Sequence, residues 1–291
     1  MVNQKLKLYS DHSRHWQTNK YVYPVISRRS KGLSIGVNLN PDTVCNFDCI
    51  YCCVDRTDRA QPPAVKEVDL TVLSDELDHM ISLAGNGEIF KTPPFDATPV
   101  PMQRINDIAF SGDGEPTSYP LFPQACRLVA DMLDKHHRND IKIVVITNAT
   151  LLARPAIVTA LEYLDAHQGE IWAKLDAGTQ EYYQLVERTS IPLSRVLDNI
   201  LHAGRIRPIV IQSLFMKIHG QSPSPLEIDA YINRLSDLNH AGCQIKGVQI
   251  YTVARQVAEA YVTPIGDDEV DAIVQRVKHI GLHAEGFYGP Q

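Results

Sequence analysis

The sequence has no apolar run that approaches the length of about 18 residues needed to cross a bilayer. Its first residues are polar and lack the apolar core of about 7–15 residues that a secretory signal contains. Neither a Gly-x-x-x-x-Gly-Lys-Ser/Thr phosphate loop nor a Gly-x-Gly-x-x-Gly dinucleotide motif occurs, so kinase, NTPase and nicotinamide-dependent classes have no support. Internal repeats and low-complexity tracts are missing too. We therefore expect a cytoplasmic globular protein that does not contact a membrane.

Cysteine is scarce outside one short segment. Four of the six cysteines lie close together, namely Cys45, Cys49, Cys52 and Cys53. In a cytoplasmic protein such a group is more often reduced, metal-binding or catalytic than paired in disulfides. The other two, Cys126 and Cys243, fall on separate predicted elements and are expected to be small buried residues. Too few thiols remain to hold a second metal cluster.

Basic side chains are concentrated at the start of the chain. The whole sequence has 28 basic and 34 acidic side chains, for a formal charge of −6. Residues 1–31, in contrast, contain Asp11 as their only acid beside seven basic residues: Lys5, Lys7, Arg14, Lys20, Arg28, Arg29 and Lys31. Aromatic residues among them could stack on RNA bases, but the acidic remainder argues against general nucleic-acid binding. We expect a solvated basic N-terminal arm folded over the body, with RNA binding as an alternative that is not favoured.

Beyond residue 32, short β-branched runs alternate with longer segments of helical period, which predicts βα units around a parallel sheet. Six strands are expected, at Leu33–Leu39, Asp107–Ser111, Lys142–Thr147, Ile171–Leu175, Ile209–Phe215 and Gly247–Val253. Helices are expected at Asp69–Leu83, Leu121–His136, Pro155–Asp165, Gln180–Val186, Leu193–His202, Pro225–Asn239 and Asp267–Ile280. Residues 32–291 are therefore expected to form one α/β domain.

Two proline-rich stretches, residues 59–64 and 85–106, interrupt this alternation. The second is a long insertion before the second predicted strand. Long irregular loops in compact domains are usually functional or disordered. A lid over a site and a plain excursion of the chain both stay open for the 85–106 insertion.

The segment Cys45-Asn46-Phe47-Asp48-Cys49-Ile50-Tyr51-Cys52 has the form C-x-x-x-C-x-x-C and follows the first predicted strand. Thiolates are soft ligands that suit iron–sulfur clusters or zinc, and three on one loop can reach the same small cluster. A structural zinc site would need a fourth ligand, for which His12, His15 and Asp48 are candidates. Three protein ligands with one open position indicate instead a reactive metal centre at Cys45, Cys49 and Cys52.

This spacing, with an aromatic residue just before the third cysteine, resembles the signature of the radical S-adenosylmethionine (radical SAM) superfamily. The resemblance implies a [4Fe-4S] cluster on Cys45, Cys49 and Cys52 whose fourth iron binds S-adenosylmethionine (SAM). It also implies a partial (β/α)6, TIM-like barrel, in agreement with the six units above. In this family the reduced cluster cleaves SAM to methionine and a 5′-deoxyadenosyl radical that abstracts hydrogen from a substrate. A one-electron donor such as flavodoxin or ferredoxin is implied as a partner.

Polar residues at later strand ends resemble the SAM-binding motifs of the same family. Gly112-Asp113-Gly114-Glu115 follows the second predicted strand and looks like the glycine–glutamate motif that receives the methionine ammonium group. Asn148 ends the third strand in a Thr-Asn-Ala-Thr sequence, in which Ala149 replaces the glycine of relatives. Asp176 follows the fourth strand and Gln212 lies in the fifth, where polar residues of relatives contact ribose or the methionine carboxylate. A tight turn with a solvated acid, a helix cap or a buried hydrogen-bonded group is the alternative at these positions.

Four further segments resemble, more narrowly, a radical SAM group related to the wyosine-base synthases of tRNA. They are residues 23–39, 174–177, 212–215 and 250–255. No cysteine precedes Cys45, so the chain lacks the second N-terminal cysteine set of those synthases and their tRNA substrate is not carried over. We expect a radical SAM enzyme that acts on an unidentified small molecule or protein. A tRNA base-modifying enzyme and a non-catalytic iron–sulfur redox or sensor protein are the alternatives.

Overall fold

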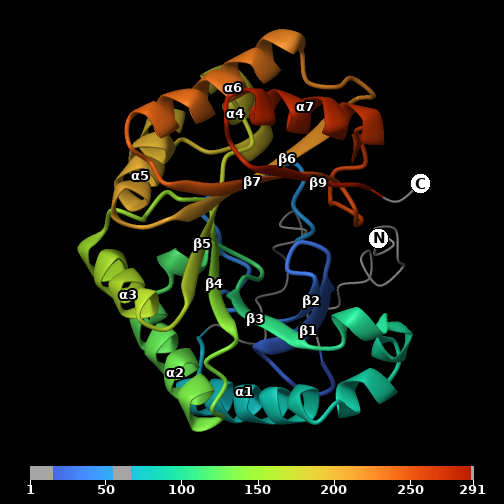
Figure 1. The fold of residues 1–291 in the computed structure, drawn as a ribbon, viewed down its shortest axis with the longest axis vertical. Helices are drawn as coiled ribbons and strands as arrows, with labels where there is room; N and C mark the ends of the chain where they lie inside the picture. The colour runs from blue at the N-terminus through green and yellow to red at the C-terminus, as the bar shows by residue number, and fades with distance from the viewer. Residues whose placement is uncertain (1–15, 55–66, 290–291) are drawn as a thin grey trace. The chain divides into compact units, whose positions relative to one another are not determined.

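The computed structural model describes residues 16–54 and 67–289 and divides into two compact units (Figure 1). Unit 1 comprises Met1–Cys45, Arg59–Ile146 and Arg154–Glu170, and unit 2 comprises Asn46–Asp58, Thr147–Ala153 and Ile171–Gln291. Residues 1–15 of the predicted arm and the proline-rich stretch at 59–64 lie outside the described residues. In the described part of the chain, no helix is long and apolar enough to cross a membrane.

The strands of unit 1 are β1 (Val22–Ser27), β2 (Gly32–Val37), β3 (Ile105–Phe110) and all but the last residue of β4 (Lys142–Thr147). β2, β3 and β4 pair in parallel, and β1 pairs with β2 in the antiparallel sense. Because the carboxyl ends of parallel strands meet at one edge, the segments that follow β2 and β3 lie together there. The sequence pattern missed β1, whose Pro24 is tolerated because an edge strand can spare one ladder hydrogen bond.

Helices α1 (Leu70–Gly85), α2 (Phe122–Lys135) and α3 (Pro155–Asp165) lie on one face of the unit 1 strands (Figure 1). α2 packs against both α1 and α3. α1 begins after Asp69, whose carboxylate accepts the first free backbone N–H groups of the helix, at Thr71 and Val72.

The predicted insertion at 85–106 contains three short 3₁₀ helices, η2 (Glu88–Lys91), η3 (Phe95–Ala97) and η4 (Val100–Met102). The insertion then meets the amino end of β2, where the carbonyl of Arg104 accepts from the N–H of Leu33 at 2.9 Å. This end of the strands is opposite the edge that carries Cys45 and the Gly112–Glu115 turn. Within unit 1 the geometry therefore favours an excursion over a lid.

The strands of unit 2 are β5 (Gly169–Lys174, from Ile171 onward), β6 (Ile209–Ile218), β7 (Ile245–Thr252), β8 (Val262–Pro264) and β9 (Ala284–Phe287). β5, β6, β7 and β9 pair in parallel in that order, while β8 pairs antiparallel with β6. The six predicted strands are all confirmed. β8 and β9 are additional, with three and four residues, which is too short for a hydrophobic period to show.

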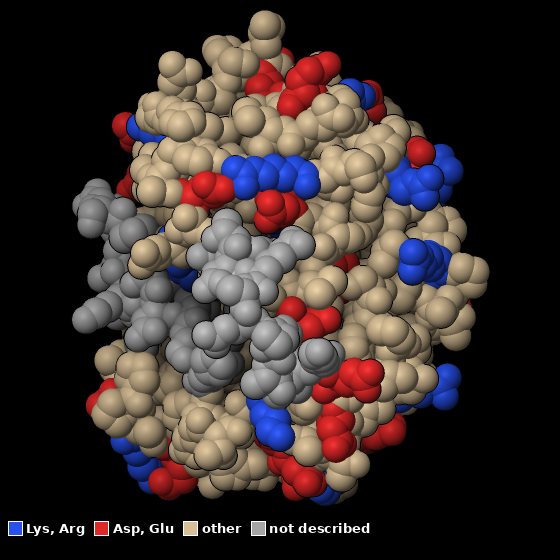
Figure 2. Space-filling view, turned by 180° about the vertical axis from the view of Figure 1, so that it is seen from behind, with Lys and Arg blue, Asp and Glu red and all other residues tan. Residues whose placement is uncertain are grey.

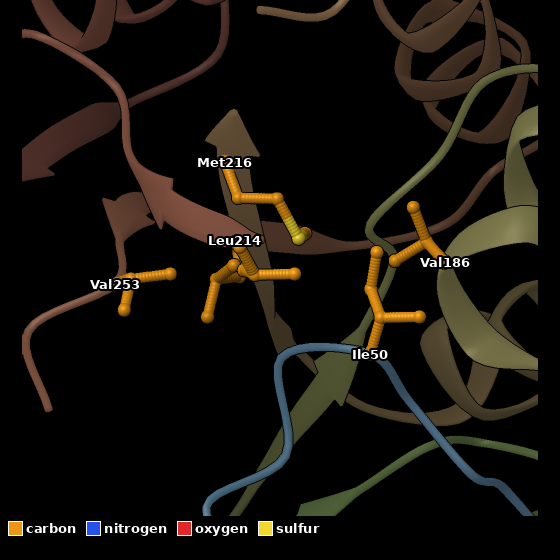
Figure 3. Close-up of a cluster of buried hydrophobic side chains, with 6 residues drawn as sticks. Ile50, Val186, Leu214, Met216 and Val253 are labelled. Carbon is orange, nitrogen blue, oxygen red and sulfur yellow. The ribbon is translucent and has the colours of Figure 1, made fainter. Parts of the chain in front are cut away.

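Helices α4 (Gln180–Glu187), α5 (Leu193–Ile206), α6 (Pro225–His240) and α7 (Asp267–His279) lie on one face of the unit 2 strands (Figure 1). Together with α1 to α3 they confirm the predicted helices. The other face of β6 contributes Leu214 and Met216 to a buried hydrophobic cluster with Ile50 and Val186 (Figure 3). Ile50 lies between Cys49 and Cys52 in the sequence. The hydrophobic cluster therefore fixes this part of the cysteine segment to the sheet of unit 2.

Candidate functional site

In unit 1, Asn38 ties the turn after β3 to the segment after β2. Its Nδ2 donates to Asp113 Oδ2 over 2.5 Å, and its Oδ1 accepts the backbone N–H groups of Asp113 and Asn40 at 3.2 and 3.0 Å. One side chain thus holds the predicted Gly112–Glu115 motif beside the segment that leads to Cys45.

A close approach of two chain segments requires glycine at position 114. A Cβ atom built on Gly114 would lie 2.8 Å from Asn40 Cβ and would collide with the carbonyl oxygen of Val44. The second glycine of the motif therefore lets the turn pack against the residue that precedes Cys45. Within unit 1, this packing brings a predicted SAM-binding turn and the first predicted cluster ligand together.

Glu115 is 3% exposed, so the alternative of a solvated turn acid is wrong. Its Oε1 accepts the backbone N–H of Thr117 at 3.1 Å and also the Thr117 hydroxyl. These contacts cap the short 3₁₀ helix η5 (Pro116–Ser118). A buried carboxylate is stable only when donors surround it, and it is a strong acceptor for a cationic donor.

In unit 2, the turn that carries Cys49 and Cys52 is fixed by its backbone. The N–H groups of Asp48 and Ile50 donate to the carbonyls of the last two residues of α4, at 3.1 and 2.9 Å. The N–H of Cys52 donates to the carbonyl of Cys49 at 3.0 Å, which closes the turn. Two predicted ligands therefore lie on a short segment with little freedom.

A ring of hydrogen bonds links Asn46 to the end of β4. Asn148 Nδ2 donates to Asn46 Oδ1 at 2.7 Å, and Asn46 Nδ2 donates to Thr150 Oγ1 at 2.8 Å. The Oδ1 of Asn148 accepts the Thr150 hydroxyl at 2.7 Å. Ala149 has a φ of 62°, in the left-handed region that favours glycine, and this accounts for the glycine of the family motif at this place.

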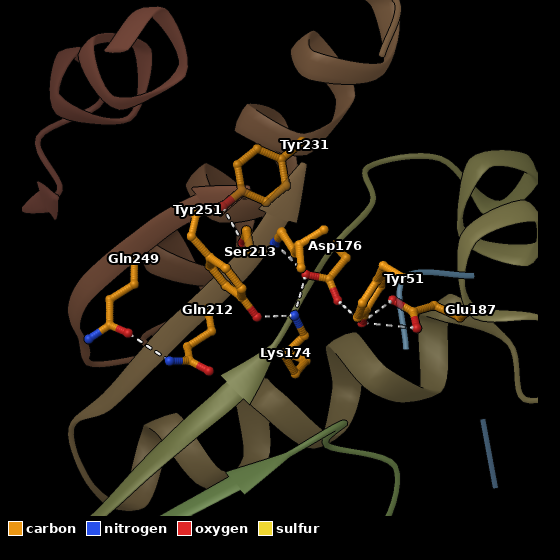
Figure 4. Close-up of polar contacts among 10 residues, drawn as sticks. Tyr51, Lys174, Asp176, Glu187, Gln212, Ser213, Tyr231, Gln249 and Tyr251 are labelled. Carbon is orange, nitrogen blue, oxygen red and sulfur yellow. Dashed lines mark hydrogen bonds and ion pairs between the residues drawn. The ribbon is translucent and has the colours of Figure 1, made fainter. Parts of the chain in front are cut away.

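Asp176 is the centre of a buried polar network in unit 2 (Figure 4). Its Oδ2 accepts from the Tyr51 hydroxyl at 2.6 Å, while its Oδ1 accepts the Leu214 N–H at 2.6 Å and Lys174 Nζ at 2.9 Å. Lys174 Nζ also donates to the Tyr251 hydroxyl at 2.5 Å. The same ammonium group lies 4.9 and 4.7 Å from the ring centroids of Tyr51 and Tyr251. Both oxygens of Asp176 therefore have donors within the chain.

The ionisable groups of this network differ in the form they favour, charged or neutral. Burial opposes the charge of Lys174, but Asp176, Tyr251 and Glu187 together outweigh burial and raise the pKa of Lys174 above its usual value. Burial and the charge of Asp176 together raise the pKa of Glu187, whose two carboxyl oxygens are each 3.3 Å from the Tyr51 hydroxyl. Lys174 and Asp176 thus form an ion pair beside a carboxyl group that favours its neutral form. No signal in the sequence marks Glu187 as part of this group.

A row of polar residues crosses four neighbouring strands of unit 2 in register: Lys174, Gln212, Gln249 and Glu285. Gln212 is fully buried, and its Nε2 donates to Gln249 Oε1 at 2.7 Å. Its Oε1 has no hydrogen-bond partner among the described residues. A buried acceptor without a partner costs about 1–3 kcal/mol, so this atom is suited to a donor on a ligand. Gln249 and Glu285 were missed because strand register, and no local motif, places them here.

The cysteines differ in exposure. Cys45, Cys49 and Cys52 are half-buried, whereas Cys126 and Cys243 are buried as predicted. Burial raises the pKa of Cys243 to about 11 and also raises that of Cys126, so both stay protonated. Within residues 16–54 and 67–289, no three His, Cys, Asp or Glu side chains are assembled as a metal-ion site. The ligand role of the three loop cysteines therefore rests on their donor chemistry and stays a prediction.

Figure 2 shows one face of the molecule, on which basic side chains lie singly or in small groups among acidic and uncharged ones. Binding along a nucleic-acid backbone generally uses a continuous basic patch or stripe. The described residues on this face do not form one.

Two curated proteins are similar to this chain. The protein named GTPase Obg of Brachyspira hyodysenteriae is 21% identical over 257 residues, which are 88% of this chain and 33% of that protein. UPF0026 protein MJ1312 of Methanocaldococcus jannaschii is 28% identical over 178 residues, which are 61% of this chain and 46% of that protein. The chain thus spans a third to nearly half of the length of these relatives. It contains no phosphate-binding loop, so the GTPase name is not carried over.

Solved structures show the fold. A radical SAM methyltransferase from Sphaerobacter thermophilus is 13% identical, with a TM-score of 0.59 over 92% of this chain and 69% of that one. The predicted α/β fold, a partial TIM-like barrel, is thereby confirmed. A structure of TYW1, a wyosine synthase, is 15% identical and covers 86% of this chain and 74% of that one, with a TM-score of 0.49.

The sequence profile described as "Radical SAM superfamily" matches residues 39–232. The matched range contains the three loop cysteines, the Gly112–Glu115 turn and the predicted contacts at Asn148, Asp176 and Gln212. The chain belongs to the radical SAM superfamily.

Proposed function

We propose that this chain is an enzyme that cleaves SAM reductively and directs the resulting radical at a substrate. A [4Fe-4S] cluster on Cys45, Cys49 and Cys52 would supply the electron that splits SAM into methionine and a 5′-deoxyadenosyl radical. The packing of the Gly112–Glu115 turn against Val44 carries the proposal. In one unit, it joins the residues proposed to hold the methionine part of SAM to the first proposed cluster ligand.

Glu115 is proposed to accept the ammonium group of SAM, because its buried carboxylate is already oriented by Thr117. Gly112, Asp113 and Gly114 would offer their backbone at close range, in a turn that Asn38 keeps in place. Gln212 is proposed as a further contact, and its buried Oε1 supports this role. Asn148 is proposed to lie beside SAM, where its hydrogen bond to Asn46 orders the segment that follows Cys45.

The substrate is proposed to be a polar small molecule or a segment of a protein. Gln212, in the polar row of Lys174, Gln212, Gln249 and Glu285, supports a polar substrate, because an apolar one would leave its buried Oε1 without a partner. The chemistry of the family needs an external one-electron donor. Flavodoxin and ferredoxin are the proposed classes of donor.

Anaerobic reconstitution with iron and sulfide tests this function. With dithionite and SAM, the wild-type protein should be brown and should release 5′-deoxyadenosine. Replacing Cys45, Cys49 or Cys52 by Ala should abolish both properties, whereas Cys53→Ala is the matched control and should keep them. Equal loss in Cys53→Ala and Cys52→Ala would show that the ligand assignment is wrong.

The same assay separates the alternative functions. A stable cluster in a protein that never cleaves SAM would indicate a redox or sensor protein. Cleavage that depends on added tRNA would indicate base modification.

A further inference from the structure

The side chain of Asp176 is fully engaged within the chain, which conflicts with a role as a SAM contact. Its exposed fraction is 0%. Oδ1 accepts from Leu214 N–H and from Lys174, and Oδ2 accepts from the Tyr51 hydroxyl (Figure 4). Because the side chain is fully buried, a ligand could reach this carboxylate only by opening the packing around it or by displacing one of these donors, which would then be left without a partner.

The donor on Oδ2 belongs to the cysteine segment itself. Tyr51 lies between Cys49 and Cys52 in the sequence, and Asp176 follows β5 directly. Leu214, which donates to the same carboxylate, lies in β6. One carboxylate therefore connects the Cys49–Cys52 turn to two strands of unit 2.

Lys174 makes this buried link stable. A buried carboxylate without a counter-charge is strongly destabilising, whereas an ion pair with good geometry largely offsets its desolvation. Lys174 supplies the counter-charge at 2.9 Å, and its ammonium group is held between the rings of Tyr51 and Tyr251.

We propose that Tyr51, Lys174 and Asp176 are positioning residues, here called the tyrosine anchor, that fix the Cys49–Cys52 turn before a cluster is bound. The inference rests on the proposed function, because it takes Cys49 and Cys52 as cluster ligands. It reassigns Asp176 from a SAM contact to a support of the ligand turn. The proposed SAM contacts are then the Gly112–Glu115 turn, Asn148 and Gln212.

Hydrogen–deuterium exchange of the metal-free, full-length protein tests the anchor without any cluster. The reporters are the N–H groups of Asp48, Ile50 and Cys52, all of which are hydrogen-bonded in the structure. Tyr51→Phe and Asp176→Asn should each speed exchange in residues 48–54 by about tenfold. In wild type, local opening of this turn must break the Tyr51–Asp176 hydrogen bond, and in the variants this cost is absent. Tyr51→Phe deletes a single oxygen atom, so it decides the test if Asp176→Asn does not fold.

Tyr231→Phe is the matched control. The Tyr231 hydroxyl forms a buried hydrogen bond to Ser213 of the same length, 2.6 Å, on the opposite face of β6. Its loss should leave exchange in residues 48–54 unchanged. The double variant Tyr51→Phe/Asp176→Asn should speed exchange by less than the product of the two single effects, because both substitutions remove the Tyr51–Asp176 bond.

The reconstituted protein provides the second measurement. Both anchor variants should release iron to a chelator about tenfold faster than wild type. Their affinity for SAM, measured on samples matched for cluster content, should stay within about twofold of wild type.

Weaker SAM binding by Asp176→Asn with unchanged exchange would overturn the proposal and restore Asp176 as a SAM contact. Unchanged exchange in Tyr51→Phe would overturn it as well. A wild-type protein that forms no cluster would contradict the proposed function instead, while the metal-free exchange still decides whether the anchor exists.

Discussion

At the scale of single residues, Glu115 combines two tasks that mutation can separate. Glu115→Gln keeps an oxygen that can accept from Thr117 but removes the negative charge proposed to meet the SAM ammonium group. A hydrogen bond to a charged group contributes about 1.5–3 kcal/mol, so SAM affinity should fall by about ten- to a hundredfold. Equilibrium binding to the reconstituted protein measures this loss, and iron and sulfide content should not change.

Thr117→Val provides the control for the capping task. It removes the hydroxyl that donates to Glu115 but leaves the carboxylate charge in place. Thermal stability should decrease while SAM affinity changes by less than the Glu115→Gln effect. If Thr117→Val weakened SAM binding more than Glu115→Gln does, Glu115 would be a structural cap only.

At the scale of elements, the turn after β4 contains a residue in an unfavourable conformation. Ala149 has a φ of 62°, and a left-handed conformation costs an L-residue roughly 1–2 kcal/mol more than it costs glycine. Part of that gain is lost because glycine is more flexible in the unfolded chain. Ala149→Gly should therefore raise the free energy of unfolding by about 1 kcal/mol, as measured by urea denaturation.

Ala160→Gly should instead lower the free energy of unfolding. Ala160 lies inside helix α3, where glycine is about 1 kcal/mol less favourable than alanine. If both glycine variants are destabilised, the left-handed turn carries no strain that glycine can relieve.

Strand β3 carries a carboxyl group whose burial makes stability depend on pH. Asp107 is 2% exposed; burial raises its pKa from 3.8 to about 6, while a hydrogen bond from Ser34 opposes the shift. Because the folded state holds the proton more tightly, the contribution of Asp107 is most favourable below pH 3.8 and is lost as pH rises to about 6. A pKa shift of this size corresponds to a change of about 3 kcal/mol in the free energy of unfolding.

Asp107→Asn should therefore be more stable than wild type at pH 7.5, by up to about 3 kcal/mol, with the advantage shrinking toward pH 4. Urea denaturation at several pH values checks this. Asp140→Asn is the control of opposite direction, because the hydrogen bond from Arg138 lowers the pKa of Asp140. Parallel stability curves for wild type and Asp107→Asn would contradict the assignment.

At the scale of the whole molecule, net charge argues against an RNA substrate. The chain has a formal charge of −6, and basic residues on the face in Figure 2 do not form a stripe. We expect no sub-micromolar RNA binding at physiological salt. If such binding were found, neutralising Lys5, Lys7, Arg14 and Lys20 should weaken it and flatten its salt dependence, which would favour a tRNA-modifying enzyme.

The sequence was most informative where a local pattern determines the structure. β4 has its predicted bounds because a continuous β-branched run between turn signals has few other solutions. The spacing of Cys45, Cys49 and Cys52 indicated the family for a similar reason, since the motif is contained in one short loop. β1 was missed because its pairing with β2, and not its own pattern, makes it a strand.

The network around Asp176 shows what local patterns do not contain. Asp176 was predicted as a contact of SAM because of its position after a strand. In the structure it accepts hydrogen bonds from Tyr51 and Leu214, which are 125 and 38 residues away in the sequence. Such long-range pairings are determined by strand register and packing, so these two partners could not be predicted from the sequence.

The position of the 85–106 insertion also offers a practical route to labelling. Its side chains Ile89, Phe95 and Met102 are buried, so the segment is held firmly, yet Val100 is 79% exposed. It meets the amino ends of β2 and β3, away from the turn that is proposed to bind SAM. A fluorophore or affinity handle attached at position 100 should therefore leave cofactor loading intact and allow partner proteins to be captured under anaerobic conditions.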